Sequence, residues 1–353
     1  MNTLSRMMRD AQVNACVRTK QFSVLSETAD VFPGDGTAAA ERAADAVRAA
    51  FARIPGGVSG IVSGALDAIV MGYAVGELVW DGVGGLSKVL WHDPRRFVAV
   101  ADDVGDLEAV DLPDRDLRFD AARFVWYAYN ARYGNPYGES DLTPAFRYYT
   151  QKDQVQRMWM MALDRFGAPT PVAYVPHSFG QARSDALANQ LGNLQTDTAI
   201  VVENDVRVTY DLEHTRTEPA KAYDTASQYL DAQIARAILG QDLTTNGTGG
   251  GSYALGKVHA DVLTDRVQML RSEIAEVVLT EQVARRICLY ACGAQVTPPV
   301  VRFPNLSAGD MQARAALVDA MLKGRVVAPE EAWLRAYLGL PAQSSVATKG
   351  ETP

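Results

Sequence analysis

The chain has 353 residues, of which 48% are hydrophobic and 22% are charged, proportions that are ordinary for a soluble folded protein with two or more packed regions. The net charge of −8 argues against a protein whose whole surface grips nucleic acid. The three cysteines, Cys16, Cys288 and Cys292, are too few for a disulfide framework and suggest a reducing compartment.

The first 142 residues alternate predicted helices and strands. Scattered charges in the first 22 residues argue against a secretion signal. The longest apolar run, residues 57–78, carries Asp67, Glu77 and five glycines, which argues against a membrane span and predicts a core helix that runs into a strand. The other predicted elements of this part are a helix at 38–53, a hairpin at 76–93, and strands at 95–103 and 122–130, while the acidic stretch 102–116 is interpreted as solvated loop and strand-edge charge.

Two helices of similar length then bracket a small insert. Thr143 as N-cap and Pro144 as first helical residue predict a helix that runs to Phe166. Pro219 opens a second helix, with apolar residues at helical spacing up to Leu239 and Gly240 as its stop. Between them we predict a strand, a short helix and a hairpin that turns at Asn204-Asp205. The arrangement indicates a stalk with a head.

A long helix is predicted over residues 253–292, because apolar residues follow in alternating steps of four and three, with Glu281 as the one interruption: Leu263, Val267, Leu270, Ile274, Val277, Ala284 and Cys288. Gly293 ends it. A strand at 300–306 and a helix pair at 307–324 and 328–341 follow. Residues 342–353 are predicted to be a tail without local structure.

The loop before the long helix is close to a phosphate-binding P-loop. Gly251, four further residues, Gly256 and Lys257 fit the pattern, but Val258 stands where a Ser or Thr should bind Mg²⁺. A predicted helix also precedes this loop, whereas a P-loop follows a buried strand. A nucleotide-binding protein using Gly251, Gly256 and Lys257 therefore remains as an alternative to a flexible loop that leads into a helix.

The sequence offers no positive evidence for catalysis. None of the four histidines lies at metal-ligand spacing from a cysteine or another histidine, and no nucleophile motif is present. We assign no catalytic residue, no cofactor and no metal ligand, and we predict that the protein is not an enzyme.

Several stretches together resemble one family. ARYGNPYGESDL before a long helix, ALDRFGAPTPVAYVP after it, and the block ILGQDLTTNGTGGGSYALGKVH are similar to the Mu-like group of portal proteins of tailed double-stranded-DNA bacteriophages. GALDAIVMGYAVGELVWD and WHDPRRFVA match the early region of that group. The resemblance covers roughly Arg18 to Pro341, and the glycine-rich block is its most specific part.

The resemblance implies an α+β portal fold that assembles as a ring, with a wing, a two-helix stem, an inserted α/β clip and a short helical crown. By this analogy the expected parts are the N-terminal part of the wing at 1–142, stem helix 1 at 143–166, the clip at 167–220, stem helix 2 at 221–240, a tunnel loop at 241–252, the long helix and strand of the wing at 253–305, and the crown with the C-terminal tail at 306–353.

The implied function is a channel for packaging and ejecting the genome at one capsid vertex of the virion, formed by a chain made in the host cytoplasm. The implied partners are further copies of this chain, commonly twelve, double-stranded DNA, the large terminase, a head-tail adaptor and the major capsid protein, with no membrane. A capsid or connector component without a DNA channel remains a second alternative.

The resemblance also selects candidate residues. The tunnel loop that would face DNA is nearly uncharged and comprises Thr244, Thr245, Asn246, Gly247, Thr248, Gly249 and Gly250. On the stem helices, Lys152, Arg157, Asp231 and Arg236 are expected to line the stem or to contact a neighbouring subunit.

Overall fold

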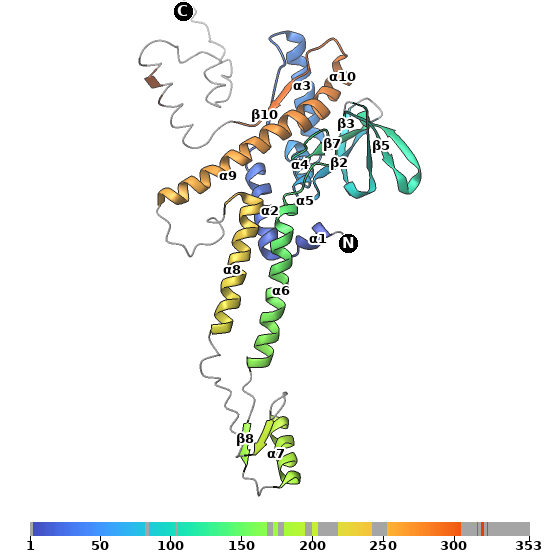
Figure 1. Cartoon of the computed structure of the whole chain (residues 1–353). Helices are drawn as coiled ribbons and strands as arrows, with labels where there is room; N and C mark the ends of the chain where they lie inside the picture. Colours follow the sequence, from blue (N-terminus) through green and yellow to red (C-terminus); the bar gives the residue numbers. More distant parts are fainter. Residues whose placement is uncertain are drawn as a thin grey trace, which may run out of the picture. The chain divides into compact units, whose positions relative to one another are not determined.

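The computed structural model describes residues 3–81, 85–103, 105–167, 172–175, 180–194, 200–203, 218–241 and 253–304, and the four helical residues 316, 319, 320 and 323. The chain divides into two compact units, Met1–Arg302 and Phe303–Pro353. The first unit contains every helix and strand whose bounds are given below (Figure 1). The predicted bounds of the C-terminal helix pair and the tail 342–353 lie outside the described residues.

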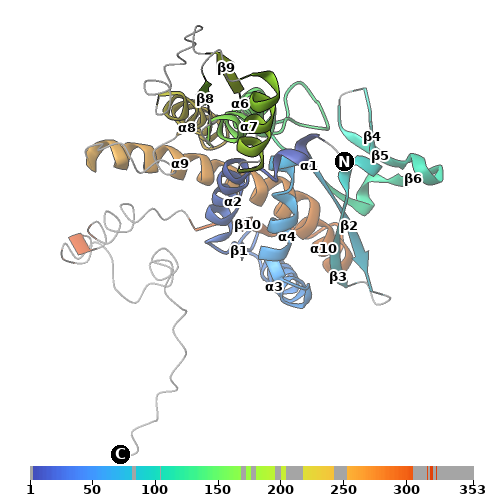
Figure 2. The same cartoon turned by 90° about the horizontal axis from the view of Figure 1, so that it is seen from below.

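Two helices that the sequence analysis did not single out open the chain, α1 (Thr3–Met7) and α2 (Ala11–Leu25). The Asp10 carboxylate caps α2 by accepting hydrogen bonds from the backbone N–H groups of Gln12 and Val13 at 2.9 and 3.0 Å. α2 packs against two later helices, α8 (Glu218–Leu239) and α9 (Tyr253–Glu273), as Figures 1 and 2 show from two directions.

A side chain of α9 caps the C-terminal end of α2. The buried Arg271 guanidinium donates to the carbonyl oxygens of Ser23 and Val24 at 2.7 and 3.1 Å. These are carbonyls of the last helical turn, which have no partner within the helix. One side chain thus joins two helices that are far apart in the sequence.

The predicted helix at 38–53 is confirmed as α3 (Ala38–Arg53), and the apolar run after it forms α4 (Gly57–Ala65) and α5 (Ala68–Met71) before a strand. Within the described ranges, no single helix is both long and apolar enough to cross a membrane. One bent pair of helices, Ala38–Arg53 and Gly57–Met71, meets that test by length and composition, with 76° between its members.

Two antiparallel three-stranded sheets follow. The predicted hairpin is confirmed as β2 (Tyr73–Trp80) and β3 (Leu86–His92), and β7 (Phe124–Ala128) pairs with the other edge of β2. The second sheet has the order β4-β5-β6, with β4 (Val98–Ala101), β5 (Leu107–Leu112) and β6 (Leu117–Asp120). Short 3₁₀ turns join these strands, η1 (Pro94–Arg96), η2 (Pro113–Arg115) and η3 (Ala121–Arg123).

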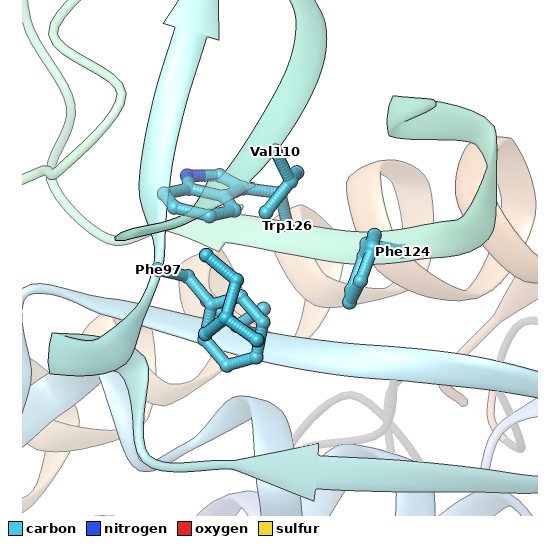
Figure 3. Packing of buried hydrophobic residues seen from close by; sticks show 6 residues of the cluster. Phe97, Val110, Phe124 and Trp126 are labelled. Carbon is cyan, nitrogen blue, oxygen red and sulfur yellow. The ribbon is translucent and has the colours of Figure 1, made fainter. Parts of the chain in front are cut away.

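The interpretation of residues 102–116 as solvated loop and strand-edge charge missed a strand in their middle part. β5 is the central strand of its sheet, with Ala109, Val110 and Leu112 buried and the charged Glu108 exposed. Acidic residues interrupt the apolar ones along β5, so its apolar side can be recognised only when the sheet that packs against it is known. Val110 and Leu112 pack in a core cluster shared by the two sheets, where the rings of Phe97 and Phe124 lie 5.7 Å apart (Figure 3).

The predicted long helix is confirmed in its extent but not in its regularity. α9 continues into a π-helical segment, η5 (Ile274–Ala284), and then into α10 (Arg285–Cys292), which ends at Gly293. The wider turns of η5 shift the buried face, so that Val278, Leu279 and Val283 are buried while Val277 is 38% exposed. The predicted inward position of Val277 was therefore wrong.

The π-helical segment closes the open edges of two sheets. The Gln282 side chain accepts a hydrogen bond from the backbone N–H of Trp126 at 2.7 Å and donates to its carbonyl at 2.9 Å. The Thr280 hydroxyl accepts from the backbone N–H of Val301 at 2.9 Å. Val301 belongs to β10 (Val300–Arg302), which pairs with β1 (Asp30–Phe32). Edge strands that would otherwise recruit other chains are thus satisfied by helix side chains.

The stalk and the insert complete the described chain. α6 (Leu142–Gly167) packs along α8. Between them lie β8 (Val172–Val175), α7 (Gln181–Leu194) and β9 (Ile200–Glu203), as a strand, a helix and a strand. β8 and β9 pair in parallel, which the intervening helix permits. The predicted turn at Asn204-Asp205 and the rest of that hairpin lie outside the described residues.

Candidate functional site

The paired helices α6 and α8 form the candidate site, since the resemblance assigns them to a stem (Figure 1). Leu230, Ile234 and Ile238 of α8 are buried, which confirms the predicted apolar face of that helix. Residues at positions 152, 155, 159 and 162 of α6 are less exposed than their neighbours, at the spacing of one helix face. The two helices therefore bury one stripe each along their length.

One of these inward positions is charged. The Lys152 ammonium lies 2.8 Å from the Asp10 carboxylate and 2.6 Å from that of Asp231, and the Lys152 side chain is only 6% exposed. Burial lowers the pKa of Lys152, but hydrogen bonds to Asp10 and Asp231 outweigh this, so the pKa is raised above its usual value. This ion cluster joins α6, α8 and the N-cap of α2.

The structure therefore places the four predicted stem residues in two groups. Lys152 and Asp231 pair with each other within one chain, and the Lys152 side chain is buried. Their predicted role in lining the stem or contacting a neighbouring subunit stays a prediction. Arg157 and Arg236 lie at exposed positions, and Arg157 pairs with Asp153 one turn away at 2.9 Å. A surface role for these two arginines stays a prediction.

A second buried ammonium lies where α6 begins, and the sequence analysis missed it. Lys20 of α2 donates to the Tyr129 hydroxyl and to the Asp141 carboxylate, both at 2.7 Å. Burial and the neighbouring carboxylate of Asp141 raise the pKa of Tyr129. The spacing of 121 residues between Lys20 and Asp141 left no local pattern from which this pairing could have been found.

The loop that leads from β7 to α6 is fixed by close backbone approach. A Cβ atom at Gly138, where φ is +57°, would lie 2.1 Å from the Tyr129 carbonyl oxygen and 2.4 Å from that of Gly72. Only glycine avoids this clash and tolerates the left-handed backbone. The GNPYG stretch of the sequence thus sets how the stalk leaves the sheet.

Outside the buried stripe, α6 exposes large apolar side chains. Met158, Met160 and Met161 are 53%, 58% and 63% exposed, and Leu163 is 45% exposed. Tyr229 of α8 is 59% exposed. Exposed apolar groups gathered on one helix are typical of a surface that is covered in an assembly, and methionine suits such a surface because its side chain adapts to its partner.

The candidate DNA-facing residues of the predicted tunnel loop, Thr244–Gly250, lie outside the described residues. The described residues on its N-terminal side show how the chain enters it. Gly240, with a φ of +78°, ends α8 as predicted, and a Cβ there would lie 2.5 Å from the Arg266 guanidinium of α9. Gln241, the last described residue before Thr244, is buried.

The nucleotide-binding alternative is contradicted by the elements around its glycines. A P-loop connects a buried strand to a helix, but the described element that precedes these glycines is α8. Gly256 and Lys257 fall within α9, which already begins at Tyr253, and Gly251 lies outside the described residues. Among the described residues there is also no group of three or more His, Cys, Asp or Glu side chains that could hold a metal ion.

Comparisons with known proteins agree on one family. A family profile described as the portal protein of Mu bacteriophage matches residues 1–340. The portal protein of Escherichia phage Mu is 22% identical over 287 residues, which cover 78% of this chain and 54% of that protein. The chain thus spans about half the length of this curated relative.

Solved structures share the fold. The neck of an empty gene transfer agent particle matches with a TM-score of 0.63 and 12% identity, over 97% of this chain and 95% of that chain. A corresponding native neck, computed with C12 symmetry, gives a TM-score of 0.60. An HK97-family phage portal protein from Corynebacterium diphtheriae matches with a TM-score of 0.51 and 14% identity, over 91% of this chain and 99% of that chain.

Proposed function

This chain belongs to the family of portal proteins of Mu bacteriophage, and from that premise we propose that it forms an oligomeric ring at one vertex of a virion capsid. The ring is the channel through which the genome is packaged and ejected. We propose twelve subunits, by analogy with the similar neck that was computed with C12 symmetry.

The observation that carries this proposal is the contrast between the two faces of the α6–α8 pair. On the inner face, Leu230, Ile234 and the Lys152 ion cluster are buried between helices of one chain. The outer surface of α6 leaves Met158, Met160 and Met161 more than half exposed. A ring in which each stem packs against the next would cover these methionines, and the hydrophobic effect would stabilise the contact.

The tunnel loop supports a channel that lets DNA slide. Each strong contact with a phosphate adds a salt-dependent attraction and therefore a barrier to movement. Between Thr244 and Gly250 the sequence has no charged residue, and its glycines would let neighbouring copies of the loop adopt different conformations around one DNA. We therefore propose that Thr244–Gly250 faces double-stranded DNA with weak, exchangeable contacts.

The further partners follow from the same role. We propose that the insert between α6 and α8 is the clip, on which the large terminase docks, and that a head-tail adaptor and the major capsid protein bind other faces of the ring. The portal would itself be structural rather than enzymatic, since the energy for packaging would come from the terminase.

Substitutions in the tunnel loop test the DNA channel. Replacing Gly247–Gly251 with lysines should leave ring assembly unchanged and should strongly reduce the number of DNA-filled capsids, because each lysine adds a phosphate contact. The readout is complementation of a phage that lacks its own portal, with filled and empty capsids counted. A matched variant with serines at the same positions should package normally. Normal filling with the lysine loop would contradict the proposal.

A further inference from the structure

The loop between β7 and α6 holds an aromatic side chain fully in solvent. Tyr133 is 103% exposed, more than any other large apolar residue in the described part of the chain. Its φ is +56°, in the left-handed region that bulky residues rarely adopt because the conformation costs free energy. The chain by itself gains nothing from an exposed ring held on a strained backbone. Tyr133 therefore points to a contact outside its own chain.

The residues around Tyr133 are fixed in place. On one side, the Trp126 indole donates to the Pro136 carbonyl oxygen at 2.6 Å. On the other side, the loop lies against the turn between β4 and β5, where a Cβ atom at Gly105 would be 3.6 Å from the Cα of Gly134. A side chain presented by a fixed loop loses little conformational entropy when a partner covers it.

A cavity of about 290 Å³ opens between the two three-stranded sheets, at the other end of the β4-β5-β6 sheet from Tyr133. Leu112 and Leu117, which pair across the β5–β6 turn, line it, whereas Tyr133 lies beside the β4–β5 turn. Tyr133 thus leaves the cavity of its own chain unfilled. The full apolar lining consists of Phe97, Leu112, Leu117, Phe119 and Phe124.

The cavity suits one uncharged aromatic side chain. Its volume lies just below the roughly 300–1,000 Å³ of small-molecule sites. Arg96 at the rim is already paired with Asp114, so it does not select an anionic ligand. Arg123 is paired with one oxygen of the Glu77 carboxylate, and His92 lies 3.0 Å from the other. This polar wall offers hydrogen-bond partners to a hydroxyl at the end of an apolar ring, which is the character of tyrosine.

We propose that Tyr133 of each subunit inserts into this cavity of the next subunit. The inference rests on the proposed ring, since it names a contact between neighbouring copies. A protruding residue and a cavity at different places on one chain make a head-to-tail contact, and such contacts build rings. Insertion buries the Tyr133 ring against Leu117 and Phe119 and brings its hydroxyl to the wall at Glu77.

Photo-cross-linking of the full chain tests this contact with an aromatic group of similar size. With p-azidophenylalanine in place of Tyr133, irradiation should give covalent oligomers, and mass spectrometry should map the linked peptide to residues 112–124 of another copy. Phe22 of α2, which is 64% exposed, is the matched control position and should give no link to residues 112–124. Leu117→Asp, at the exposed opening, should lower the yield from position 133 at least about tenfold, with the fold checked by circular dichroism.

Three results would overturn the contact: no covalent oligomers from position 133, links that map outside residues 112–124, or a yield that Leu117→Asp leaves unchanged. Negative-stain images of the same samples separate this inference from the proposed function. Rings that form without the link contradict the Tyr133 contact alone. A protein that forms no rings contradicts the proposed function, and with it the contact.

Discussion

At the scale of single residues, two lysines are buried where helices from distant parts of the chain meet. Lys152 lies between Asp10 and Asp231, and Lys20 lies between Tyr129 and Asp141. A buried ion pair adds little net stability over a well-packed apolar group, but removal of one member leaves an uncompensated charge. We therefore infer that both clusters fix the position of α2 against the stalk helices rather than add much net stability.

The Lys152 cluster gives a direct prediction of stability. Lys152→Met should lower the free energy of unfolding by about 3 kcal/mol, because the carboxylates of Asp10 and Asp231 would lose their shared cation while partly buried. The measurement is urea unfolding followed by tryptophan fluorescence at one fixed protein concentration. Arg157→Met is the matched control on the same helix and should change the free energy by less than about 1 kcal/mol, because its pair with Asp153 is exposed. Equal losses for the two variants would rule out the role assigned to the cluster.

Cys16 predicts how stability depends on pH. Burial, followed by the negative charges of Asp231 and Asp10, raises the pKa of the Cys16 thiol from 9.0 to about 11. In the unfolded chain the thiol loses its proton first, so this group lowers the free energy of unfolding as pH rises from 9 toward 11. The slope from this one group is at most about 1.4 kcal/mol per pH unit.

Thermal or urea unfolding across this pH range measures the effect as a difference between variants. Cys16→Ala should flatten the decline of stability between pH 9 and 11 relative to the wild-type protein. A slope that Cys16→Ala leaves unchanged would show that the thiol does not titrate as described.

At the scale of elements, the π-helical segment η5 is the feature that joins the sheets to the long helix. Gln282 completes both backbone hydrogen bonds on the free edge of β7 at Trp126, and Arg286 of α10 donates to the Phe124 carbonyl oxygen at 2.6 Å. A side-chain amide here takes the place of a neighbouring strand. The segment therefore protects an edge that could otherwise pair with another chain.

Substitution of Gln282 tests this role. Gln282→Leu should lower the free energy of unfolding by about 2 kcal/mol, because it leaves the backbone N–H and C=O groups of Trp126 without partners in a partly buried place. Urea unfolding again provides the measurement. The adjacent Glu281 is exposed and pairs with Arg285 one turn away, so Glu281→Leu should cost less than about 1 kcal/mol. A Gln282 variant as stable as the Glu281 variant would argue against the edge-closing role.

The sequence predicted the elements well wherever local signals were strong. The stop of α8 at Gly240, the apolar stripe of α8 and the β2–β3 hairpin follow from periodicity and turn residues, and the structure confirms them. β5 and the position of Val277 were missed for different reasons. The apolar side of β5 is recognisable only with its partner sheet, and the π-helical turns change the period on which the prediction for Val277 rested.

The candidate site was predictable in outline and not in detail. The resemblance assigns α6 and α8 to a stem, but nothing local in the sequence shows that Lys152 of α6 is buried, because its partners Asp10 and Asp231 lie far from it along the chain. A long-range pair of this kind leaves no local pattern. The cavity between the two three-stranded sheets shows the same limit, since its lining comes from both sheets and the turns between them.

At the scale of the whole molecule, self-association is the property from which the proposed function follows. A subunit with a closed inner stem face and exposed methionines on the outer surface can bury those methionines against another copy. If the contact joins two different faces of neighbouring subunits, repeated contacts close into a ring when the rotation between neighbours divides a full turn, and otherwise they give an open filament. A channel for DNA, a docking face for a motor and a place at one capsid vertex all require this closed ring.

The most direct test is native mass measurement of the purified assembly combined with negative-stain imaging. The account predicts closed rings with a central hole and a mass near twelve times the 38.2 kDa subunit, and a Met158→Asp/Met161→Asp variant that shifts the protein toward smaller species. A wild-type protein that stays monomeric at high concentration, or that forms open filaments or particles without a central hole, would contradict it.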